Sequence, residues 1–331
     1  MSNISQNLFR QTISFCPECY KRIPAVVFIE ADGVWMKKTC SEHGESVTMV
    51  ERDPVFYSQI MKSGAQTIYP GYFIDVTEKC NLNCKYCYYP TNNKTKDKTI
   101  DAIAQNALIH GQLAPFILTG GEPTLRSDLS EIILTLQKIG PVELLTNGTG
   151  IKDLEKFGTL LNGDVFNINL SVHPEIKDDN LRVLELFRQC RKKIESILVV
   201  VDKVDQIDNV IDLCDEYRDV ICATRIKAAT KVWNEQSPNN KIFVSDLYNY
   251  ITSRWGAKMT WWRPNKTSFV TTELNGIYHM LVSWYDAGNV DIADIACAPY
   301  YQAKTGETLN ILTAMLVNEG ILKGWLNGEK I

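Results

Sequence analysis

Three cysteines on one short run constrain this chain more than any other feature. Cys80, Cys84 and Cys87 are spaced C-x3-C-x2-C and follow the apolar stretch Tyr72–Val76. Three thiolates on one loop can each hold one iron of a [4Fe–4S] cube, which leaves the fourth iron without a protein ligand. An open iron of this kind can bind a small molecule and pass it an electron. The alternatives are a zinc site, for which His110 is the nearest histidine along the chain, and a disulfide, which a chain without secretory features does not favour.

A Gly-Gly-Glu-Pro motif follows at the end of a second apolar stretch. It occupies residues 120–123, directly after Phe116–Thr119. Glycines leave backbone groups open to close approach by a ligand. A cysteine loop followed in order by this motif resembles the radical S-adenosylmethionine (SAM) superfamily. The resemblance implies that Cys80, Cys84 and Cys87 are the ligands of a [4Fe–4S] cluster, and that the glycine motif faces the methionine amino group of SAM.

Between residues 66 and 256, apolar strands alternate with amphipathic helices, which is typical of an α/β fold. The expected strands are Tyr72–Thr77, Pro115–Thr119, Val142–Thr146, Val165–Ser171, Ser196–Val201 and Val220–Lys227. The expected helices are Asp101–Gln112, Leu129–Ile139, Ile151–Leu161, Asp179–Lys193 and Gln206–Tyr217, and Ser245 is the expected N-cap of a further helix, Asp246–Trp255. Six such units match the partial (β/α)6 TIM barrel that the resemblance implies.

Binding groups in such barrels gather at the C-terminal ends of the strands. The resemblance therefore implies a set of cofactor-binding residues at those ends. In chain order they are Tyr86, Gly120, Gly121, Glu122, Thr146, Asn147, Ser171 and Arg225. Tyr86 precedes the third cysteine, where the backbone of a hydrophobic residue contacts the adenine of SAM in the family.

Each of these polar strand ends also has a plainer interpretation. Thr146, Asn147 and Gly148 can be a turn, since Asn-Gly favours turns by itself. Ser171 and His173 can simply begin the next loop, and His173 can instead be an acid or base toward substrate, because the ordinary pKa of histidine is near neutral. Arg225 can pair with the SAM carboxylate through its planar guanidinium, or with an acidic residue of a neighbouring strand.

The resemblance also implies the chemistry. A reduced cluster cleaves SAM to methionine and a 5′-deoxyadenosyl radical, which abstracts hydrogen from a substrate carbon. A flavodoxin or ferredoxin would supply the electron. We expect a small-molecule substrate, with peptide and tRNA modification as alternatives. A non-catalytic protein that binds zinc and an iron–sulfur cluster is the competing hypothesis from another class.

The N-terminal region, residues 1–65, carries a second set of metal-ligating side chains. Cys16 and Cys19 form one pair, and Cys40 and His43 form another. Together they are the ligand set of a closed Cys3His zinc site, and an Asp-Gly turn between two strand-like runs, with a third strand over Val47–Glu51, predicts a small ribbon that joins them. A rubredoxin-type iron is the alternative, against which the histidine argues. The segment resembles the N-terminal module of radical SAM proteins that include the tetraether lipid synthases and a pterin-precursor methyltransferase.

The third region, residues 257–331, is rich in tryptophan and tyrosine and breaks the alternation of strands and helices. We expect it to form an α+β cap over the open side of the barrel, with a final helix over Glu307–Leu326. Arg263, His279 and Asp286 are its candidates for contact with substrate. Cys297 lies in an aromatic loop, where it either packs or quenches a substrate radical by hydrogen donation.

Composition supports a soluble metalloprotein and sets few further limits. The net charge of −4 gives no general attraction to nucleic acid or to anionic membranes. The polar N-terminal segment lacks the apolar core of a signal peptide, so we expect a cytoplasmic protein. Ten cysteines in a reducing compartment indicate metal ligands before disulfides. Cys190, Cys214 and Cys222 are expected to be core residues, so the sequence predicts a single iron–sulfur cluster.

Overall fold

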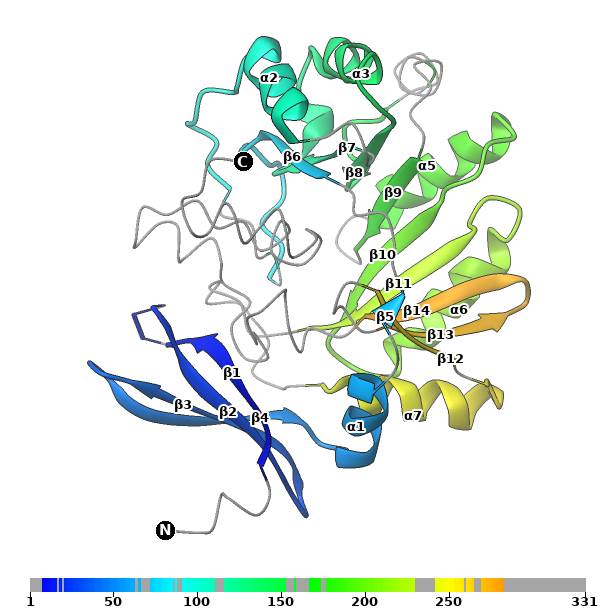
Figure 1. Ribbon diagram of the computed structural model, residues 1–331. Coiled ribbons are helices and arrows are strands. Elements are labelled where there is room, and N and C mark those ends of the chain that lie inside the picture. Colours follow the sequence, from blue (N-terminus) through cyan, green and yellow to red (C-terminus); the bar gives the residue numbers. More distant parts are fainter. Residues whose placement is uncertain are drawn as a thin grey trace.

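The computed structural model describes most of the chain up to Val282. The residues described are 8–16, 18–19, 21–62, 65–66, 72–85, 87, 91–110, 116–152, 158, 167–173, 177–229, 242–258, 260–264 and 269–282. Their strands form two sheets, one of four strands and one of ten. Figure 1 shows the four-stranded sheet in blue and the larger sheet in colours that run from cyan to orange.

The four-stranded sheet is an antiparallel meander made by the first part of the chain. Its strands are β1 (Leu8–Phe15), β2 (Arg22–Glu30), β3 (Gly33–Cys40) and β4 (Gly44–Glu51). β2 and β3 are joined by the Asp32-Gly33 turn that the sequence predicts, and Gly33 has a φ of 155°, which favours glycine. β4 confirms the expected third strand, while β1 is an additional strand that pairs with β2.

Six neighbouring parallel strands form the body of the ten-stranded sheet. They are β6 (Tyr72–Thr77), β7 (Phe116–Gly120), β8 (Val142–Thr146), β9 (Asn167–Val172), β10 (Ser196–Val201) and β11 (Ala223–Ala228). They pair in chain order, as a (β/α) barrel requires. The structure therefore confirms an α/β fold with six consecutive barrel strands. Because the strands are parallel, their C-terminal ends share one edge of the sheet.

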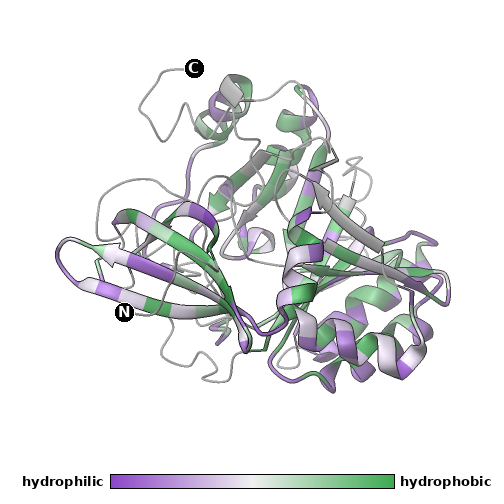
Figure 2. Cartoon of the chain, turned by 60° about the horizontal axis from the view of Figure 1, so that its bottom comes forward, coloured by the Kyte–Doolittle hydropathy of each residue, from purple (hydrophilic) through white to green (hydrophobic). Residues whose placement is uncertain are grey.

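Amphipathic helices cover the outer face of these strands. They are α2 (Ile100–His110), α3 (Leu129–Gln137), α5 (Lys177–Gln189), α6 (Gln206–Glu216) and α7 (Val244–Trp255). In α6 the buried residues are Ile207, Val210, Ile211 and Cys214, which lie on one face because their spacing follows the helical period. Hydrophobic and hydrophilic segments accordingly alternate along the outer helices in Figure 2. None of the described helices is both long and apolar enough to cross a membrane.

The barrel sheet continues past the sixth parallel strand into the region that the sequence assigns to a cap. β14 (Ile277–Val282) pairs in parallel with β11, and β13 (Phe269–Leu274) and β12 (Thr260–Pro264) follow in antiparallel order. The two-residue strand β5 (Ala65–Gln66) closes the row. The described part of residues 257–331 thus extends the barrel sheet itself. The helix expected over Glu307–Leu326 and most of that expected over Ile151–Leu161 lie outside the described residues.

A buried polar contact joins the four-stranded sheet to the barrel. Glu51, at the end of β4, is fully buried and accepts hydrogen bonds from the hydroxyl (2.6 Å) and the backbone N–H (3.3 Å) of Ser245 in α7. The prediction that Ser245 caps this helix is wrong, because α7 begins at Val244 and the Ser245 hydroxyl serves Glu51. The helix α1 (Pro54–Lys62) follows and lies beside α7 in Figure 1.

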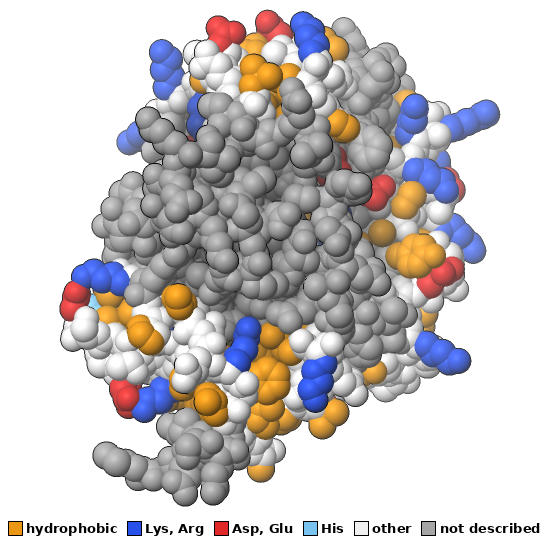
Figure 3. Space-filling view, in the orientation of Figure 1, with side chains coloured by type: hydrophobic (Ala, Val, Ile, Leu, Met, Phe, Trp, Pro, Cys, Tyr) orange, Lys and Arg blue, Asp and Glu red, His pale blue; other side chains and the backbone are white. Residues whose placement is uncertain are grey.

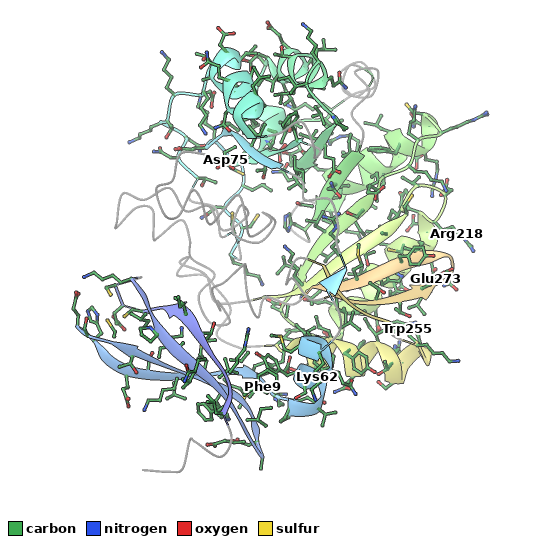
Figure 4. All side chains as sticks on the ribbon, viewed as in Figure 1. Phe9, Lys62, Asp75, Arg218, Trp255 and Glu273 are labelled. Carbon is green, nitrogen blue, oxygen red and sulfur yellow. The ribbon has the colours of Figure 1, made fainter. Side chains whose placement is uncertain are left out.

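Aromatic packing supports the same junction. Tyr57 of α1 is fully buried, and its ring lies 5.4 Å from that of Phe9 in β1. Phe56 of α1 packs against Tyr248 of α7 with ring centroids 5.1 Å apart. Figure 4 labels Phe9 on β1 and Lys62 at the end of α1, close to this contact. The helix α1 therefore touches both the ribbon and the barrel.

Candidate functional site

The three loop cysteines lie directly after the first barrel strand, β6. Cys80, Cys84 and Cys87 are all partly exposed. The backbone N–H of Leu82 donates to Cys80 Sγ over 3.4 Å, and the N–H of Cys87 donates to the carbonyl of Cys84 over 3.0 Å. Burial raises the pKa of Cys80, and the nearby Glu122 adds to the shift. The loop thus presents three sulfurs at the edge where all the parallel strands end.

The base of this loop is fixed by an ion pair beneath it. Asp97 accepts from the Thr77 hydroxyl at 2.6 Å and pairs with the Lys79 ammonium at 2.7 Å. Burial alone would raise the pKa of Asp97, but donation from Lys79 and Thr77 holds it below its usual value. The N–H of Cys80 also donates to Asn93 Oδ1 over 2.9 Å. The segment after the cysteines therefore folds back to hold their start.

The two motif glycines permit the end of β7 to touch the cysteine loop. A Cβ on Gly120 would lie 2.0 Å from the Thr77 carbonyl oxygen, and one on Gly121 would lie 2.1 Å from the Lys79 carbonyl oxygen. At this short range the N–H of Gly121 donates to Thr77 and that of Glu122 donates to Lys79, each over 2.8 Å. From the sequence, these glycines are predicted to face the amino group of SAM. The structure shows that the absence of side chains at Gly120 and Gly121 permits close backbone packing against the cysteine loop.

Glu122 is enclosed in a hydrogen-bond network of its own. Its side chain is buried and accepts from the Thr146 hydroxyl (2.5 Å), the Asn147 N–H (2.7 Å), and the hydroxyl (2.5 Å) and N–H (3.0 Å) of Thr124. Burial raises the pKa of Glu122, and these four donors act against that shift. The carboxylate thus ties the end of β7 to the end of β8. Thr146 and Asn147, both predicted to contact SAM, are brought to Glu122 by this network.

Two further residues, neither of which is predicted from the sequence, complete the network. Thr149 accepts from Asn81 Nδ2 over 2.8 Å, which ties the turn after β8 to the cysteine loop. Asn180, a buried residue of α5, donates to the carbonyls of Asn147 (3.2 Å) and Ser171 (3.1 Å). Thr149 lies 68 positions from Asn81, and Asn180 lies 33 positions from Asn147, so no local pattern points to these two contacts.

The cysteine loop is also tied across the barrel mouth. Lys85, between the second and third cysteines, forms an ion pair of 2.5 Å with Asp202, which follows β10. Gln206 Nε2 donates to the other oxygen of Asp202 over 2.8 Å. Donation from Lys85 holds the pKa of Asp202 below its usual value. This contact joins the first and fifth barrel strands at the edge where the site lies.

The structure separates the remaining polar candidates onto two faces of the sheet. Ser171 and His173, at the end of β9, are partly exposed, and the N–H of His173 donates to Asn180 over 3.1 Å. Arg225 is partly exposed on β11, between two buried neighbours. His279 is buried against Thr224 at 2.9 Å, and its register partner is Thr224 rather than Arg225. Burial lowers the pKa of His279 to about 4, and its place on the helix-facing side argues against the substrate contact expected of it.

Some predicted residues lie outside the described part of the chain. They are Tyr86, Asp286 and Cys297, and nothing of the Arg263 side chain is described. Among the remaining cysteines, Cys214 is buried as predicted, and burial raises its pKa to about 12. Cys190 and Cys222 are only partly buried.

The four N-terminal ligand residues come together at one end of the four-stranded sheet. Their ligand atoms all lie within 4.8 Å of one another. Cys19 Sγ is 3.9 Å from Cys40 Sγ, and His43 Nδ1 is 3.7 Å from Cys16 Sγ and 3.6 Å from Cys40 Sγ. A tetrahedral ion with bonds of about 2.3 Å to sulfur and about 2.1 Å to nitrogen has ligand–ligand edges of roughly 3.5–3.8 Å. The observed spacings fit a zinc ion.

The three loop cysteines differ from this group in their spacing. Among the described histidine, cysteine and acidic side chains, the N-terminal group is the one close enough to hold a single ion. A cube with iron and sulfide at alternate corners separates its thiolates more widely than one ion does. The geometry therefore does not favour the three-thiolate zinc site at Cys80, Cys84 and Cys87.

Family models match both parts of the chain. Residues 74–216 match the radical SAM superfamily, and residues 8–52 match the zinc ribbon domain described as the HMPTM N-terminal zinc ribbon domain. The chain therefore contains a radical SAM domain, which belongs to a superfamily of enzymes, preceded by a zinc ribbon domain.

Curated relatives carry enzyme names. The chain is 32% identical over 196 residues to a 7,8-dihydro-6-hydroxymethylpterin dimethyltransferase of Methanocaldococcus jannaschii, a match that covers 49% of this chain and 38% of the relative. It is 32% identical over 121 residues to a GTP 3′,8-cyclase of Aquifex aeolicus, covering 34% of this chain and 37% of the relative. The chain thus matches less than half the length of these relatives.

A solved structure is similar at lower identity. Streptococcus suis SuiB bound to S-adenosylmethionine has a TM-score of 0.48 and 20% sequence identity, over 60% of this chain and 51% of that one.

Proposed function

We propose that this protein is a radical SAM enzyme in which Cys80, Cys84 and Cys87 hold a [4Fe–4S] cluster. One observation supports this most strongly: the three cysteines lie at the C-terminal end of the first barrel strand, packed against the Gly-Gly-Glu end of the second. Cys80, Cys84 and Cys87 would hold this cluster, and the chemistry that it would supply is the one-electron reductive cleavage of SAM to methionine and a 5′-deoxyadenosyl radical.

The chain's own residues hold this site in shape. Glu122 and Asn81 link the cysteine loop with the ends of β7 and β8, and Lys85 links it with β10 through Asp202. A site fixed before its ligand arrives loses little free energy on ordering. The side chains of Glu122 and Thr146 are already engaged in this network, so Ser171 and Arg225 are the polar side chains that we assign to the ribose and carboxylate of SAM. Tyr86 and the motif glycines are assigned to the adenine and the amino group through their backbones.

The substrate is proposed to be a small molecule. The relatives named above are a hydroxymethylpterin dimethyltransferase and a GTP cyclase, and both names refer to small molecules. His173 is partly exposed at the end of β9, where it can give or take a proton, and Cys297 is the proposed hydrogen donor to a substrate radical. The described Lys and Arg side chains on the visible face are spread around its edge rather than gathered in one patch (Figure 3).

Two further assignments accompany this function. The Cys3His site is proposed to hold structural zinc, since all four positions of a tetrahedron are filled by protein ligands. The electron is proposed to come from a cytoplasmic flavodoxin or ferredoxin.

The experiment is a label-transfer assay. The protein is purified without oxygen, reconstituted with iron and sulfide, and reduced in the presence of SAM and small molecules deuterated at single carbons. The proposal predicts deuterium in the 5′-deoxyadenosine formed with the true substrate. If zinc rather than a cluster fills the three-cysteine loop, the proposal is wrong and the non-catalytic binding protein is favoured.

A further inference from the structure

Three exposed lysines lie beside the cysteine loop and have no part in the site described above. They are Lys94, Lys96 and Lys98, in the segment, cyan in Figure 1, that leads from the loop to α2. The residues between them, Thr95 and Asp97, are partly buried. The segment thus alternates between side chains that contact the protein and ammonium groups that face solvent. We call the three lysines the lysine stripe.

The side chains between the lysines hold the stripe against the base of the cysteine loop. The hydroxyl of Thr95 donates to Glu78 Oε2 over 2.6 Å. Asp97 pairs with the ammonium of Lys79 over 2.7 Å. Both anchoring partners directly precede Cys80, the first cysteine of the loop. The stripe therefore keeps a fixed place beside the loop rather than hanging free in solvent.

The two ends of the stripe are fixed as well. Asn93, which precedes it, accepts from the N–H of Cys80 over 2.9 Å. Arg126 donates to the carbonyl of Lys98 over 2.9 Å and to a backbone carbonyl of β6 over 2.6 Å. Neighbouring Cα atoms are about 3.8 Å apart, so Lys94 lies one residue away from a direct hydrogen bond to the first cysteine. A molecule that binds the stripe is thereby placed next to the cysteine loop.

The stripe is a local excess of positive charge in a chain whose net charge is −4. The neighbouring carboxylates are engaged elsewhere, since Asp97 pairs with Lys79 and Asp202 pairs with Lys85. In the part of the chain that the structure describes, no carboxylate forms an ion pair with an ammonium group of the stripe. A concentration of one charge at a surface attracts partners of the opposite charge and speeds their association.

We propose that the lysine stripe is the docking surface for the electron donor, a small carrier protein with an acidic face around its redox group. This inference rests on the proposed function, because it concerns delivery of the electron to the loop of Cys80, Cys84 and Cys87. In the step, one electron leaves the reduced carrier, which is oxidised, and reduces the oxidised cluster. Complexes between redox carriers are small and transient, and charge attraction forms them quickly. A stripe fixed to the cysteine loop attracts an acidic carrier and seats it beside the cluster ligands.

The composition of the segment favours a protein carrier over RNA, the other acidic partner that lysines attract. Proteins that bind single-stranded nucleic acid add aromatic and arginine side chains on which bases stack. Residues 91–98 contain neither. The stripe therefore offers charge without a stacking surface, which suits carboxylates on a folded protein.

Cross-linking tests this inference without SAM. The full-length protein, reconstituted with its cluster and zinc, is mixed with an acidic flavodoxin and, separately, with an acidic ferredoxin. A carbodiimide joins lysines directly to the carboxylates that contact them, and peptide mass spectrometry locates the joined residues. We expect cross-links at the stripe with one of the two carriers, and their loss at high salt. Lys192 and Lys193 are exposed before the N-terminal end of β10, at the opposite edge of the parallel strands, and should not be joined.

Reduction of the cluster gives a second readout. Changing all three stripe lysines to glutamate should slow reduction by the carrier about tenfold or more at low ionic strength. The extent of reduction by dithionite and the absorption spectrum of the cluster should stay unchanged, which also shows that the loop is intact. The matched control changes Arg191, Lys192 and Lys193, another run of three exposed cations, to glutamate. The carrier should reduce this control as fast as the wild type.

The outcomes separate the inference from the function on which it rests. Cross-links confined to other lysines, or equally slow reduction in both triple variants, would overturn the docking surface even if dithionite supports SAM cleavage. Binding of tRNA at physiological salt that the stripe variant loses and the control keeps would also overturn it, in favour of RNA. Cross-links at the stripe in a protein whose reduced cluster never cleaves SAM would keep the docking surface and reject the proposed function.

Discussion

Two adjacent glycines set how closely the second barrel strand approaches the cysteine loop. Replacing Gly121 by alanine places a carbon 2.1 Å from the Lys79 carbonyl oxygen, a distance that backbone atoms cannot tolerate. We predict that Gly121→Ala displaces the loop and lowers the iron bound after reconstitution, with a loss of about 2–4 kcal/mol in the free energy of unfolding. Iron analysis and urea denaturation measure the two effects.

Gly256→Ala is the matched control for this substitution. Gly256 ends α7 with a φ of 62°, and a Cβ there meets nothing within 4 Å. Gly256→Ala should lower the free energy of unfolding by only about 1 kcal/mol, through backbone strain, and should leave iron binding unchanged. Equal iron content in Gly121→Ala and the wild type would show that the close approach is unimportant to the cluster loop.

Local spacing explains which site residues could be predicted. The cysteines and the Gly-Gly-Glu motif are short patterns, and their chemistry can be inferred from the sequence alone. Thr149 and Asn180 could not be predicted in this way, because each contacts residues that only the fold brings near. Asn81, for example, donates a hydrogen bond to Thr149, which lies 68 positions further along the chain.

At the scale of elements, one ion pair ties the cysteine loop to the fifth strand. Asp202→Asn removes the charge that Lys85 contacts, so we predict faster amide exchange over residues 82–87 and weaker iron retention. Because the pKa of Asp202 is depressed in the folded protein, its stabilising effect is present above the ordinary carboxyl pKa and is lost as the pH falls through the folded value. The wild-type loop should therefore loosen only in acid.

The partly exposed pair of Asp208 and Arg254 offers a matched control for the loop. Asp208→Asn removes a comparable charge from α6, far along the chain from the cysteines, and should leave exchange in the loop unchanged. If both variants exchange alike over residues 82–87, Asp202 does not hold the loop.

Zinc binding by the four-stranded ribbon can be tested separately from the barrel. Cys40→Ser removes a ligand that lies within 4 Å of both Cys19 and His43, so bound zinc should fall to near zero and the ribbon should become sensitive to protease. Cys190→Ser, in neither ligand set, is the control. Elemental analysis measures the metal, and a variant that keeps zinc at the wild-type level would rule out the Cys3His site.

Helices and strands were predicted correctly where a local stretch of sequence carries the whole pattern. The helical period and apolar runs gave the six parallel strands in order, and the paired cysteines with Asp32-Gly33 gave the hairpin. β12, β13 and β14 were expected in a separate cap, because their aromatic residues hide the alternation typical of a strand. Their place is fixed by pairing with β11, which is a long-range contact.

At the scale of the whole molecule, the ribbon and barrel meet through a small buried contact. Glu51 and Ser245 are 194 positions apart, and α1 packs beside them on aromatic rings of β1 and α7. Burying a carboxylate is costly unless it is hydrogen-bonded, so this contact holds only when the two parts are aligned. No sequence pattern predicts such a junction, since neither residue stands in a motif.

The most direct measurement of the central claim is release of 5′-deoxyadenosine from SAM by the reduced, reconstituted protein. The account predicts product from the wild type and from Cys190→Ser, and none from Cys84→Ala, because the loop then holds only two of its three thiolates. Equal product from Cys84→Ala and the wild type would contradict the account, as would an intact [4Fe–4S] cluster that never cleaves SAM with any candidate substrate present.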